Sequence, residues 1–365
     1  MTFPLDNFIT KAKFQRHSDE FIDDAKNYIQ KLEKAELPIL FSIFHLCLSA
    51  KISIKLILAL CRSDRIHYYK RFKIAKKRGG YRIILSPNNE LKYLQKWILI
   101  NILEKIPSHK SCQGFDKNKS IKKNAEIHIG SECILKIDLL RFYDSINEKR
   151  VYGIFKSLGY HKNLAVSMAK ICTVEVKENF LKAFTKNESD LKNKISSQKE
   201  GILPQGAPSS PKLSNLILRR LDQRLHCLAK KNGINYSRYA DDLTFSGKEE
   251  KLKELKKIIY MIIKDENFFI NYGKTNFLKR GNRFFVTGLS VHNEKVTVPK
   301  KFKSNIEHHL YHCIKNGVIA HTKKNGIENR NFKDWLLGCI CFINSVEPEL
   351  GEDFFEKFNE INWPI

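Results

Sequence analysis

Apolar residues recur every three or four positions over long stretches of this chain, which is the spacing of one face of an amphipathic α-helix. One stretch follows Pro211, where Ser209 and Ser210 supply a serine cap and the proline takes the first helical position. That stretch stops at Asn232-Gly233. In all, the pattern predicts helices within residues 19–60, 91–106, 211–232 and 248–264, and again from residue 300 to the end.

Shorter apolar runs, bounded by glycine or polar residues, predict strands between these helices. A basic run ending in Gly79-Gly80 precedes residues 81–85, which suits a hairpin, and residues 133–139 form an apolar run typical of a buried strand. Residues 234–245 alternate strongly enough for two strands joined by a tight bend. Residues 177–200 are polar and weakly periodic, so we expect an insertion lying on the surface. This mixture indicates the α+β class.

The charge balance indicates a polyanionic partner. Lys and Arg number 65 against 39 Asp and Glu, which leaves a formal net charge of +26. Such a surplus favours nucleic acid over neutral or acidic partners. A lysine-rich surface that is merely solvated is the alternative that charge alone leaves open.

The nine cysteines show no paired spacing such as C-x-x-C, which favours reduced thiols and a cytoplasmic protein. The first ten residues lack the basic and then apolar order of a signal peptide. The most apolar stretch, residues 37–61, is broken by Pro38, His45, Lys51 and Lys55. We therefore interpret it as packed helices and expect no membrane contact.

Three carboxylates suggest the chemistry. Asp241 and Asp242 lie at the predicted bend, and Asp138 lies near the end of the predicted buried strand. Two like charges about 4 Å apart repel by roughly 4 kcal/mol at an effective dielectric of about 20, so a cluster of three is tolerated mainly with bound cations. Oxygen ligands favour magnesium, and a pair of ions suits phosphoryl transfer. An ordinary Asp-Asp turn is the alternative for the pair by itself.

The order and spacing of three motifs resemble the palm of reverse transcriptases. They are Asp138, the segment 203–211 (Leu-Pro-Gln-Gly-Ala-Pro-Ser-Ser-Pro) and Tyr239-Ala240-Asp241-Asp242. The resemblance extends over about residues 68–300. Its further parts are Gly80-Tyr81-Arg82 with Pro87 and Leu91-Lys92, which look like the fingers motif, and Asn271 with Lys274-Thr275, which looks like the later palm motif.

Two shorter signatures resemble those of bacterial retron reverse transcriptases. Residues 124–128 (Asn-Ala-Glu-Ile-His) fit the pattern N-A-x-x-H, and Val286-Thr287-Gly288 fits V-T-G. By themselves, Asn and His also cap helices, and V-T-G also ends strands. Their position in register with the palm motifs indicates a retron enzyme.

The resemblance implies a right-hand polymerase fold of the α+β class. Fingers with N-terminal helices would occupy residues 1–132, and a palm of antiparallel sheet and helices would occupy residues 133–298, with the polar insertion at about 177–200. A helical thumb would occupy residues 299–365.

The resemblance also implies roles for the carboxylates and their neighbours. Asp138 and Asp241 would hold two magnesium ions with help from Asp242, and the carbonyl oxygen of Leu139 would complete the shell on the nucleotide side. Tyr143 matches the aromatic gate that excludes a ribose 2′-hydroxyl and so selects deoxynucleotides. A core aromatic is the alternative for this tyrosine.

Other segments would complete the nucleotide pocket. Arg82 would pack on the incoming base and reach its triphosphate, a use that suits a planar guanidinium. Gln205 would hydrogen-bond a sugar or a template edge, and Gly206 would let the backbone approach the substrate closely. Lys274 would neutralise or protonate pyrophosphate, with a solvated surface lysine as the alternative.

Residues expected to contact RNA lie in the fingers, in the two retron signatures and on a thumb helix. A cluster of His308, His309, His312 and Cys313 could be drawn as a zinc site, but no second group of ligands lies nearby in the sequence. A helix surface that packs along a duplex accounts for the cluster better. The expected RNA contacts are Lys76, Lys77, Asn124, His128, Thr287, His308 and His312.

A retron enzyme, as the resemblance implies, copies its own structured noncoding RNA with deoxynucleoside triphosphates. It starts from the 2′-hydroxyl of a guanosine in that RNA and leaves a branched RNA-DNA product, called msDNA. Members of the family act in antiphage defence, and we expect a separate effector protein here. Two alternatives stay open: a group II intron-like or other defence reverse transcriptase that uses a 3′ primer, and a non-catalytic RNA-binding scaffold.

Overall fold

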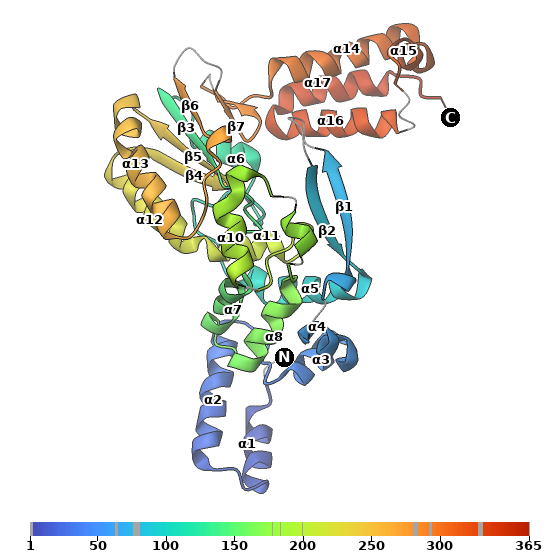
Figure 1. Cartoon of the computed structure of the whole chain (residues 1–365). Helices are drawn as coiled ribbons and strands as arrows, with labels where there is room; N and C mark the ends of the chain where they lie inside the picture. The colour runs from blue at the N-terminus through green and yellow to red at the C-terminus, as the bar shows by residue number, and fades with distance from the viewer. Residues whose placement is uncertain are drawn as a thin grey trace.

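The computed structural model describes most of the chain and shows an elongated molecule. Figure 1 shows a four-stranded sheet and a separate two-stranded hairpin on opposite sides of its upper half, with a group of C-terminal helices above the hairpin. Lys76 and Lys77 lie outside the described residues, so their phosphate contacts stay predictions. The described residues are 3–62, 65–75, 81–176, 178–182, 184–198, 200–279, 284–291, 294–327 and 331–364.

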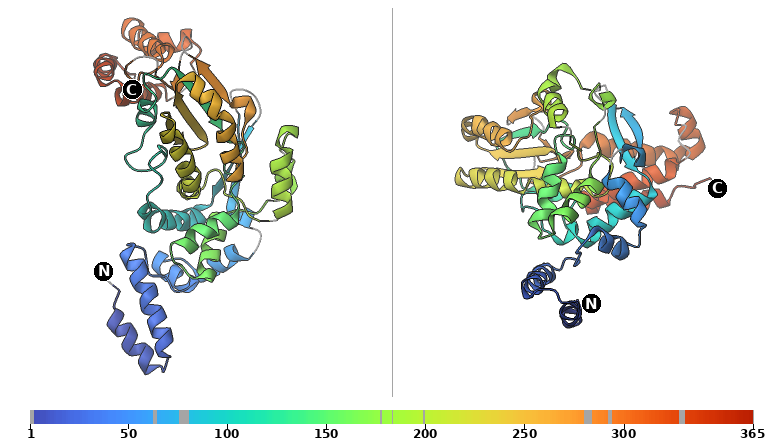
Figure 2. Two further views of the ribbon diagram at one scale, coloured as in Figure 1. Left: turned by 90° about the vertical axis from the view of Figure 1, so that its left-hand side faces the viewer. Right: turned by 60° about the horizontal axis from the view of Figure 1, so that its bottom comes forward.

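Helices form the N-terminal part, and α1 and α2 project from it as a hairpin (Figures 1 and 2). The Ser18 hydroxyl accepts a hydrogen bond from the Phe21 amide at 3.2 Å, which caps α2, and acidic residues in the first turn and lysines in the last suit the helix dipole. Helix α1 was not predicted. The elements are α1 Leu5–Phe14, α2 Asp19–Lys34, α3 Ile43–Ala50, α4 Ile54–Cys61, η1 Arg65–Tyr68, α5 Asn89–Asn101, η2 Leu103–Lys105 and α6 Ile121–Glu126.

The predicted fingers hairpin is present as strands β1 (Tyr69–Ala75) and β2 (Tyr81–Pro87). The two strands are antiparallel, and Ile74 pairs with Arg82. Six of the seven residues of β1 are exposed, so one side of this hairpin faces solvent.

The central sheet is antiparallel and contains β3 (Cys133–Asp138), β4 (Asn235–Tyr239), β5 (Asp242–Gly247) and β6 (Asn276–Lys279), in the order β4-β5-β3-β6. Strands β4 and β5 are joined by a two-residue loop, because Tyr239 pairs with Asp242. Strand β3 is buried at nearly every position, as its continuous apolar run predicted.

One predicted helix is in fact two. Residues 210–231 form α11 (Ser210–Ile217) and α12 (Arg219–Lys231), with a break at Leu218. The serine cap is also wrong, because the Ser209 side chain makes no capping bond and the Ser210 hydroxyl donates to the Pro204 carbonyl at 2.7 Å. The remaining elements around the sheet are α7 Glu148–Ser157, α8 Lys162–Cys172, α13 Glu249–Asp265 and η4 Tyr272–Lys274.

The polar insertion is more ordered than predicted. It contains α9 (Glu178–Leu181), η3 (Lys186–Glu188) and α10 (Ser189–Gln198), and Leu191 and Ile195 of α10 are buried. The insertion therefore does not merely lie on the surface, since its longest helix joins the main core.

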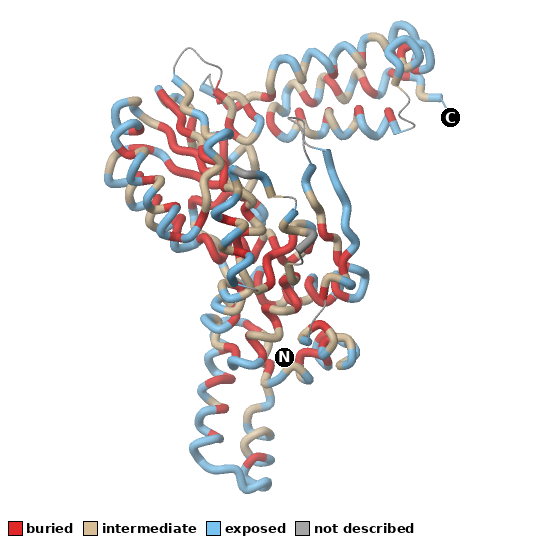
Figure 3. The backbone as a smooth tube through the Cα atoms, in the orientation of Figure 1, coloured by how far each residue is buried: buried red, intermediate tan, exposed pale blue. Residues whose placement is uncertain are grey.

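A second core unites the C-terminal helices with a small hairpin of β7 (Phe285–Val286) and β8 (Leu289–Ser290). Figure 3 shows the buried faces of these helices turned toward one another. Every helix in the described ranges is too short or too polar to cross a bilayer. The C-terminal helices are α14 Lys300–Asn316, α15 Val318–Lys324, α16 Phe332–Val346 and α17 Pro348–Asn359.

A buried ion pair supports the β4–β5 loop. The Arg238 guanidinium binds the Asp222 carboxylate through two hydrogen bonds of 2.8 and 2.7 Å, and both side chains are fully buried. The same guanidinium donates to the carbonyl oxygen of Ala240 at 3.0 Å and to Asn215 Oδ1 at 3.1 Å. Ala240 has a φ of 55°, a left-handed conformation that is rare for a residue with a side chain, so this bond helps to hold the turn.

Replacing Arg238 by Met is expected to lower the free energy of unfolding by about 3–5 kcal/mol, because the buried Asp222 carboxylate would lose its charged partner and keep the hydrogen bond from the Tyr236 hydroxyl. Urea unfolding followed by circular dichroism measures the change. The double variant Arg238→Met/Asp222→Leu should recover most of the loss. A loss below about 1 kcal/mol in the single variant would mean that the pair is not the support described here.

Candidate functional site

Three carboxylates meet at one end of the central sheet. Asp138 ends β3 and pairs directly with Asp242, the first residue of β5, so the two side chains share a face of the sheet. The Leu139 amide donates to the Asp241 carbonyl at 3.0 Å, which ties the two-residue loop to the end of β3. The structure therefore brings together Asp138, Asp241 and Asp242, as predicted.

Asp138 already has two side-chain partners. Its Oδ1 accepts from Asn271 Nδ2 at 2.8 Å, and its Oδ2 lies 3.0 Å from Lys274 Nζ. The main-chain N–H of Asn271 also donates to the main-chain carbonyl of Asp138 at 2.8 Å. Asp138 is 8% exposed, whereas the Lys274 side chain is 49% exposed and has room to move. Asn271 and Lys274 of the predicted later palm motif thus reach the carboxylate site.

Burial and neighbouring carboxylates raise the pKa values of Asp241 and Asp242. Burial, followed by the charges of Asp242 and Asp138, raises the pKa of Asp241 to about 6. Burial also raises the pKa of Asp242, with Asp138 acting in the same direction and Lys136 against it. Carboxylates that are buried close together, with Lys274 and Lys136 offsetting only part of their charge, favour the binding of added cations.

The donor set suits a hard divalent cation, although the side chains do not form a finished cage. In the part of the chain that the structure describes, no three acidic, histidine or cysteine side chains are arranged to hold an ion as they lie. At this site, Asn271 and Lys274 both engage Asp138. Ion binding here requires the mobile ammonium group of Lys274 to give way.

Two of the nucleotide-binding candidates, Gln205 and Gly206, contact the fingers hairpin. The Gln205 carbonyl accepts from the Leu85 amide at 2.8 Å, so the segment predicted to line the pocket is fastened to β2, the strand that carries the exposed Arg82. Gly206 has a φ of +121°, and a Cβ there would lie 2.9 Å from the Leu85 carbonyl oxygen. Only glycine allows this contact between the two segments.

Tyr143 lies beside the carboxylates. Burial raises the pKa of its phenol, and the charge of Asp241 acts in the same direction. Ser214, Arg238 and Arg82 lower it, which shows that the tyrosine lies within electrostatic reach of the fingers arginine. Tyr143 therefore lies within electrostatic reach of both Asp241 and Arg82.

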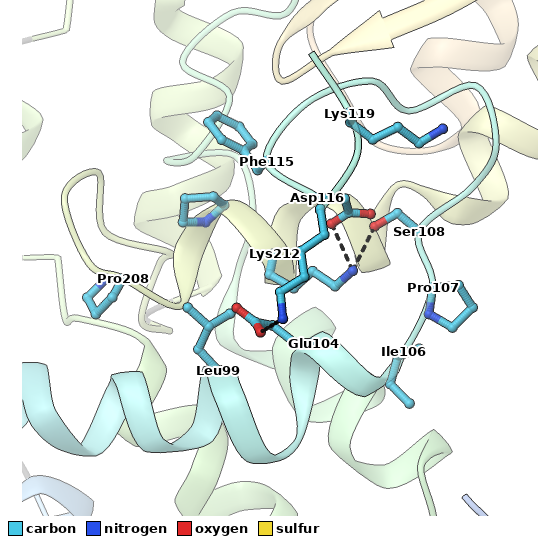
Figure 4. Close-up of a pocket in the computed structure, with 12 residues that line it drawn as sticks. Leu99, Glu104, Ile106, Pro107, Ser108, Phe115, Asp116, Lys119, Pro208 and Lys212 are labelled. Atoms are coloured by element: carbon cyan, nitrogen blue, oxygen red, sulfur yellow. Dashed lines mark hydrogen bonds and ion pairs between the residues drawn. The ribbon is translucent and has the colours of Figure 1, made fainter. Parts of the chain in front are cut away.

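A cavity of about 480 Å³ adjoins the site between α5, the loop after it and the start of α11 (Figure 4). Its walls include the apolar side chains of Leu99, Ile106 and Pro211. Lys212 lies in it with its Nζ 2.8 Å from Asp116 Oδ1 and 3.2 Å from Ser108 Oγ. Phe115 links it to the carboxylate loop, because its ring centroid lies 5.8 Å from that of Tyr239. Sequence reasoning did not find this cavity.

The two retron signatures contact each other, and two of their residues are buried. Asn124 Nδ2 lies 3.5 Å from Thr287 Oγ1, and the Thr287 hydroxyl donates to the Ile121 carbonyl at 3.0 Å. His128 is fully buried between the hydroxyls of Ser246 and Ser237, at 2.8 and 2.7 Å. The predictions that Asn124 and His128 contact RNA are therefore wrong for this structure, because neither side chain is accessible.

These buried residues stabilise contacts between elements inside the protein. Burial lowers the pKa of His128 to about 3, so the ring is neutral and acts as a hydrogen-bonded core residue. Thr287 has a φ of 48°, which is strained for a β-branched residue, and its bonds to α6 hold the β7–β8 turn in that conformation. Thr287 remains partly accessible.

The histidine cluster on α14 gains a member that the sequence did not indicate. His321 of α15 is buried, and its Nε2 lies 2.8 Å from His309 Nδ1. His308 is exposed and His312 is partly exposed, with ring centroids 4.4 Å apart. Both remain available for the RNA contact that we predicted.

Sequence reasoning also missed Arg238 and Arg141. Arg238 stands in a buried strand, and Asp222 stands on the apolar face of α12, so two charges in apolar positions were a signal of a buried pair. Arg141 follows Asp138 by three residues, has a φ of 42°, and its Nε lies 2.9 Å from Glu188 Oε1 in the insertion. No local pattern connects those two segments.

Comparison with known proteins identifies a family. Residues 74–304 match the family described as reverse transcriptase (RNA-dependent DNA polymerase). The Retron Ec86 reverse transcriptase of Escherichia coli is 34% identical over 342 residues, which cover 90% of this chain and 96% of that protein. The Retron Mx162 reverse transcriptase of Myxococcus xanthus is 29% identical over 313 residues, which cover 82% of this chain and 62% of that protein.

A solved structure of telomerase from Candida albicans, in complex with a fragment of telomeric RNA, is a more distant match. It has a TM-score of 0.42 and 14% identity, over 80% of this chain and 56% of that chain. The family assignment rests on the sequence matches, because a similarity of this size supports no inference about residues.

Asp241→Asn is expected to raise the free energy of unfolding of the metal-free protein by up to about 3 kcal/mol at pH 8 and to have little effect near pH 4. A carboxyl whose pKa is about 6 in the folded state and 3.8 in its ordinary state destabilises the fold once it ionises, and this cost develops as the pH rises from about 4 to 6.

Urea unfolding in EDTA at several pH values measures this difference. Asp24→Asn, on the exposed side of α2, is the matched control and should show no such trend. An equal gain at low and high pH for Asp241→Asn would contradict the carboxylate repulsion described here.

Proposed function

The chain belongs to the reverse transcriptase family, among the retron-type enzymes, and we propose that it copies a cognate noncoding RNA into branched msDNA. It is an RNA-directed DNA polymerase. The observation that carries the proposal is the meeting of Asp138, Asp241 and Asp242 at one end of the sheet.

Divalent cations fit the carboxylate site, and we propose that they are magnesium. Asp138 and Asp241 would hold two ions, with Asp242 and the Leu139 carbonyl oxygen as further ligands. Bound ions would supply charge neutralisation and a lowered pKa for the attacking hydroxyl group. The raised pKa of Asp241 supports this, because a cation would favour the ionised form that repulsion now opposes.

Lys274 has a place in this proposal. Its ammonium group neutralises Asp138 in the structure and is half exposed, so it can turn toward a phosphate when another cation takes its place. This supports the predicted role in neutralising or protonating pyrophosphate. The side chain would then alternate between two anionic partners during each addition.

Nucleotide selection falls to residues from three segments. Tyr143 would exclude a ribose 2′-hydroxyl, and Arg82 would pack on the incoming base. Gln205 and Gly206 would form the wall on which the nucleotide lies, and the bond between the Gln205 carbonyl and the Leu85 amide keeps this wall attached to the fingers hairpin. Movement of that hairpin would then carry Arg82 and the wall together.

The cavity beside α11 is suited to a base of the template strand. Its apolar walls offer a surface for stacking, and lysines at its edge, such as Lys119, offer charge for a phosphate. The contact between Phe115 and Tyr239 connects this cavity to the carboxylate loop. His308 and His312 of α14 would contact the duplex farther along.

The domain assignment follows from these roles. Residues 1–132 would form the fingers with N-terminal helices, residues 133–298 the palm, and residues 299–365 the thumb. The C-terminal helices share their core with the β7–β8 hairpin, so thumb and palm would move as connected bodies rather than as independent ones.

We further propose that synthesis starts from a guanosine 2′-hydroxyl and that the product serves in antiphage defence with a separate effector protein. The support is the identity to the Retron Ec86 reverse transcriptase together with the paired N-A-x-x-H and V-T-G signatures. A 3′-primed defence enzyme and a non-catalytic scaffold are the alternatives that the experiments below separate.

Replacing Tyr143 by Ala is expected to increase the use of ribonucleotides relative to deoxynucleotides at least tenfold, or about 1.4 kcal/mol, because the 2′-hydroxyl would no longer meet the ring. Steady-state incorporation of each triphosphate measures the ratio. Tyr143→Phe keeps the bulk and should keep the discrimination. Unchanged selectivity in the alanine variant would identify Tyr143 as a core residue only.

Purification from native cells tests the retron proposal. The bound nucleic acid should contain DNA joined to RNA through a 2′,5′ linkage, which resists RNase and is opened by a debranching enzyme. Primer extension should stop in EDTA and resume with Mg²⁺. Asp241→Asn should bind the same RNA without any attached DNA.

Two other results would change the proposal. Wild-type protein with RNA-linked DNA that carries only 3′,5′ linkages would favour the 3′-primed alternative. Wild-type protein that binds RNA but incorporates no deoxynucleotide would favour the scaffold.

A further inference from the structure

A second cavity, of about 370 Å³, lies on the outer edge of the central sheet. Strand β4 is the edge strand, and the cavity is built around its first residues, Asn235 and Tyr236. Strand β4 runs from Asn235 at this end to Tyr239 at the catalytic loop, four residue steps that correspond to about 14 Å at 3.4 Å per residue. The cavity is therefore separate from the carboxylate site and from the cavity in Figure 4.

The walls of this cavity are held by main-chain bonds. The Arg238 amide donates to the Ser111 carbonyl, and the Gln113 amide donates to the Arg238 carbonyl, both at 2.8 Å. The loop that carries Lys110 and Ser111 thus extends the sheet beyond β4. On the other side, His226 and Lys230 project from α12, whose residues up to Lys231 are helical. The cavity is preformed between two rigid elements.

His226 has an unused polar atom in this cavity. Its Nδ1 lies 3.1 Å from Ser111 Oγ, while its Nε2 is shielded from solvent and has no partner among the described residues. When the Ser111 hydroxyl donates to Nδ1, the ring carries its proton on Nε2, which is then a shielded donor beside the cavity wall. A shielded donor without an acceptor points to a missing ligand or water.

Two lysines bring positive charge to the same place. Burial lowers the pKa of His226, and the charges of Lys110, His109 and Lys230 lower it further, so these groups lie within electrostatic reach of the ring. Lys110 and Lys230 are exposed at the rim, and neither forms an ion pair with a residue that the structure describes. The rim therefore attracts an anion.

The floor of the cavity is apolar. Ala229, Ile234 and Tyr236 are buried there, below the polar rim. A volume of about 370 Å³ falls within the range of roughly 300–1,000 Å³ for small-ligand sites. An apolar floor, an imidazole donor and two ammonium groups together match an unpaired nucleotide, with a flat base and a phosphate, better than a bare anion or an apolar peptide.

We propose that this cavity holds one unpaired nucleotide of the RNA on which the protein works. The base lies against the floor formed by Ala229 and Ile234 and accepts a hydrogen bond from His226 Nε2. The adjoining phosphates contact Lys110 and Lys230. The inference rests on the proposed function only in requiring a bound RNA, and it adds a recognition point outside the catalytic cleft.

The experiment uses the full-length protein and a labelled 20-nucleotide single-stranded RNA, with the cleft saturated by an unlabelled template-primer duplex. Lys110→Glu/Lys230→Glu is expected to weaken RNA binding at least tenfold. It should also reduce the slope of log K against log salt by about 1.4, or 0.7 for each lost phosphate contact. The control Lys231→Glu/Lys264→Glu carries the same charge change at exposed positions outside the cavity and should weaken binding less than threefold.

Cross-linking locates the contact. RNA that contains 5-iodouridine should cross-link on irradiation to the segment that holds Tyr236 or to that holding His226, and His226→Phe should reduce the yield in the folded protein. An equal loss of binding in both double variants would overturn the proposal, since only general charge would then matter. Cross-links confined to other segments would also overturn it.

Polymerase activity is measured in a separate assay. Extension of a short oligonucleotide template at saturating concentration should stay within twofold of wild type in Lys110→Glu/Lys230→Glu. Failure of the wild-type protein to extend any primer would refute the proposed function, while cross-linking in the cavity would still stand by itself.

Discussion

The Arg238–Asp222 pair is the interaction on which the carboxylate site depends. A two-residue loop between β4 and β5 places Asp241 and Asp242 beside Asp138 only if Ala240 keeps a left-handed conformation. The guanidinium donates to the Ala240 carbonyl and is itself held by a fully buried carboxylate. Because both charges are buried, neither tolerates loss of the other. A strand, a helix and the catalytic loop are joined at this one point.

The same arrangement concentrates negative charge at the loop, and this charge favours the binding of cations. Burial, together with the neighbouring carboxylates, raises the pKa of Asp241 and of Asp242, and Lys274 forms an ion pair with Asp138. Folding has thus placed an uncompensated anionic cluster beside a pocket. Such a cluster is costly without cations and becomes favourable with them, which is why the proposed magnesium ions and the enzymatic activity are linked physically.

The retron signatures turn out to be structural ties. Asn124 and Thr287 join α6 to the β7–β8 hairpin, and His128 joins the end of α6 to strands β4 and β5. These contacts connect the core of the C-terminal helices to the central sheet. Because Asn124 and His128 are buried, RNA would have to contact more accessible groups, such as the partly exposed Thr287 and the cavity at the edge of β4.

The sequence by itself determined the local features: the helical periods of α2, α5 and α13, the hairpins, and carboxylates at a strand end and at a bend. These depend on backbone geometry over a few residues, so spacing and turn chemistry were enough. Family motifs added the expectation that Asp138 and Asp241 meet.

Only the tertiary structure decided which polar groups are buried and whom they contact. His128 lies between two serines of different strands, Asp222 holds Arg238, and His321 joins a cluster on another helix. Helix α10 of the insertion packs against the core, and Glu188 of the insertion forms an ion pair with Arg141. In each case the partner lies far along the chain, and burial depends on the packing of whole elements, which no local pattern records.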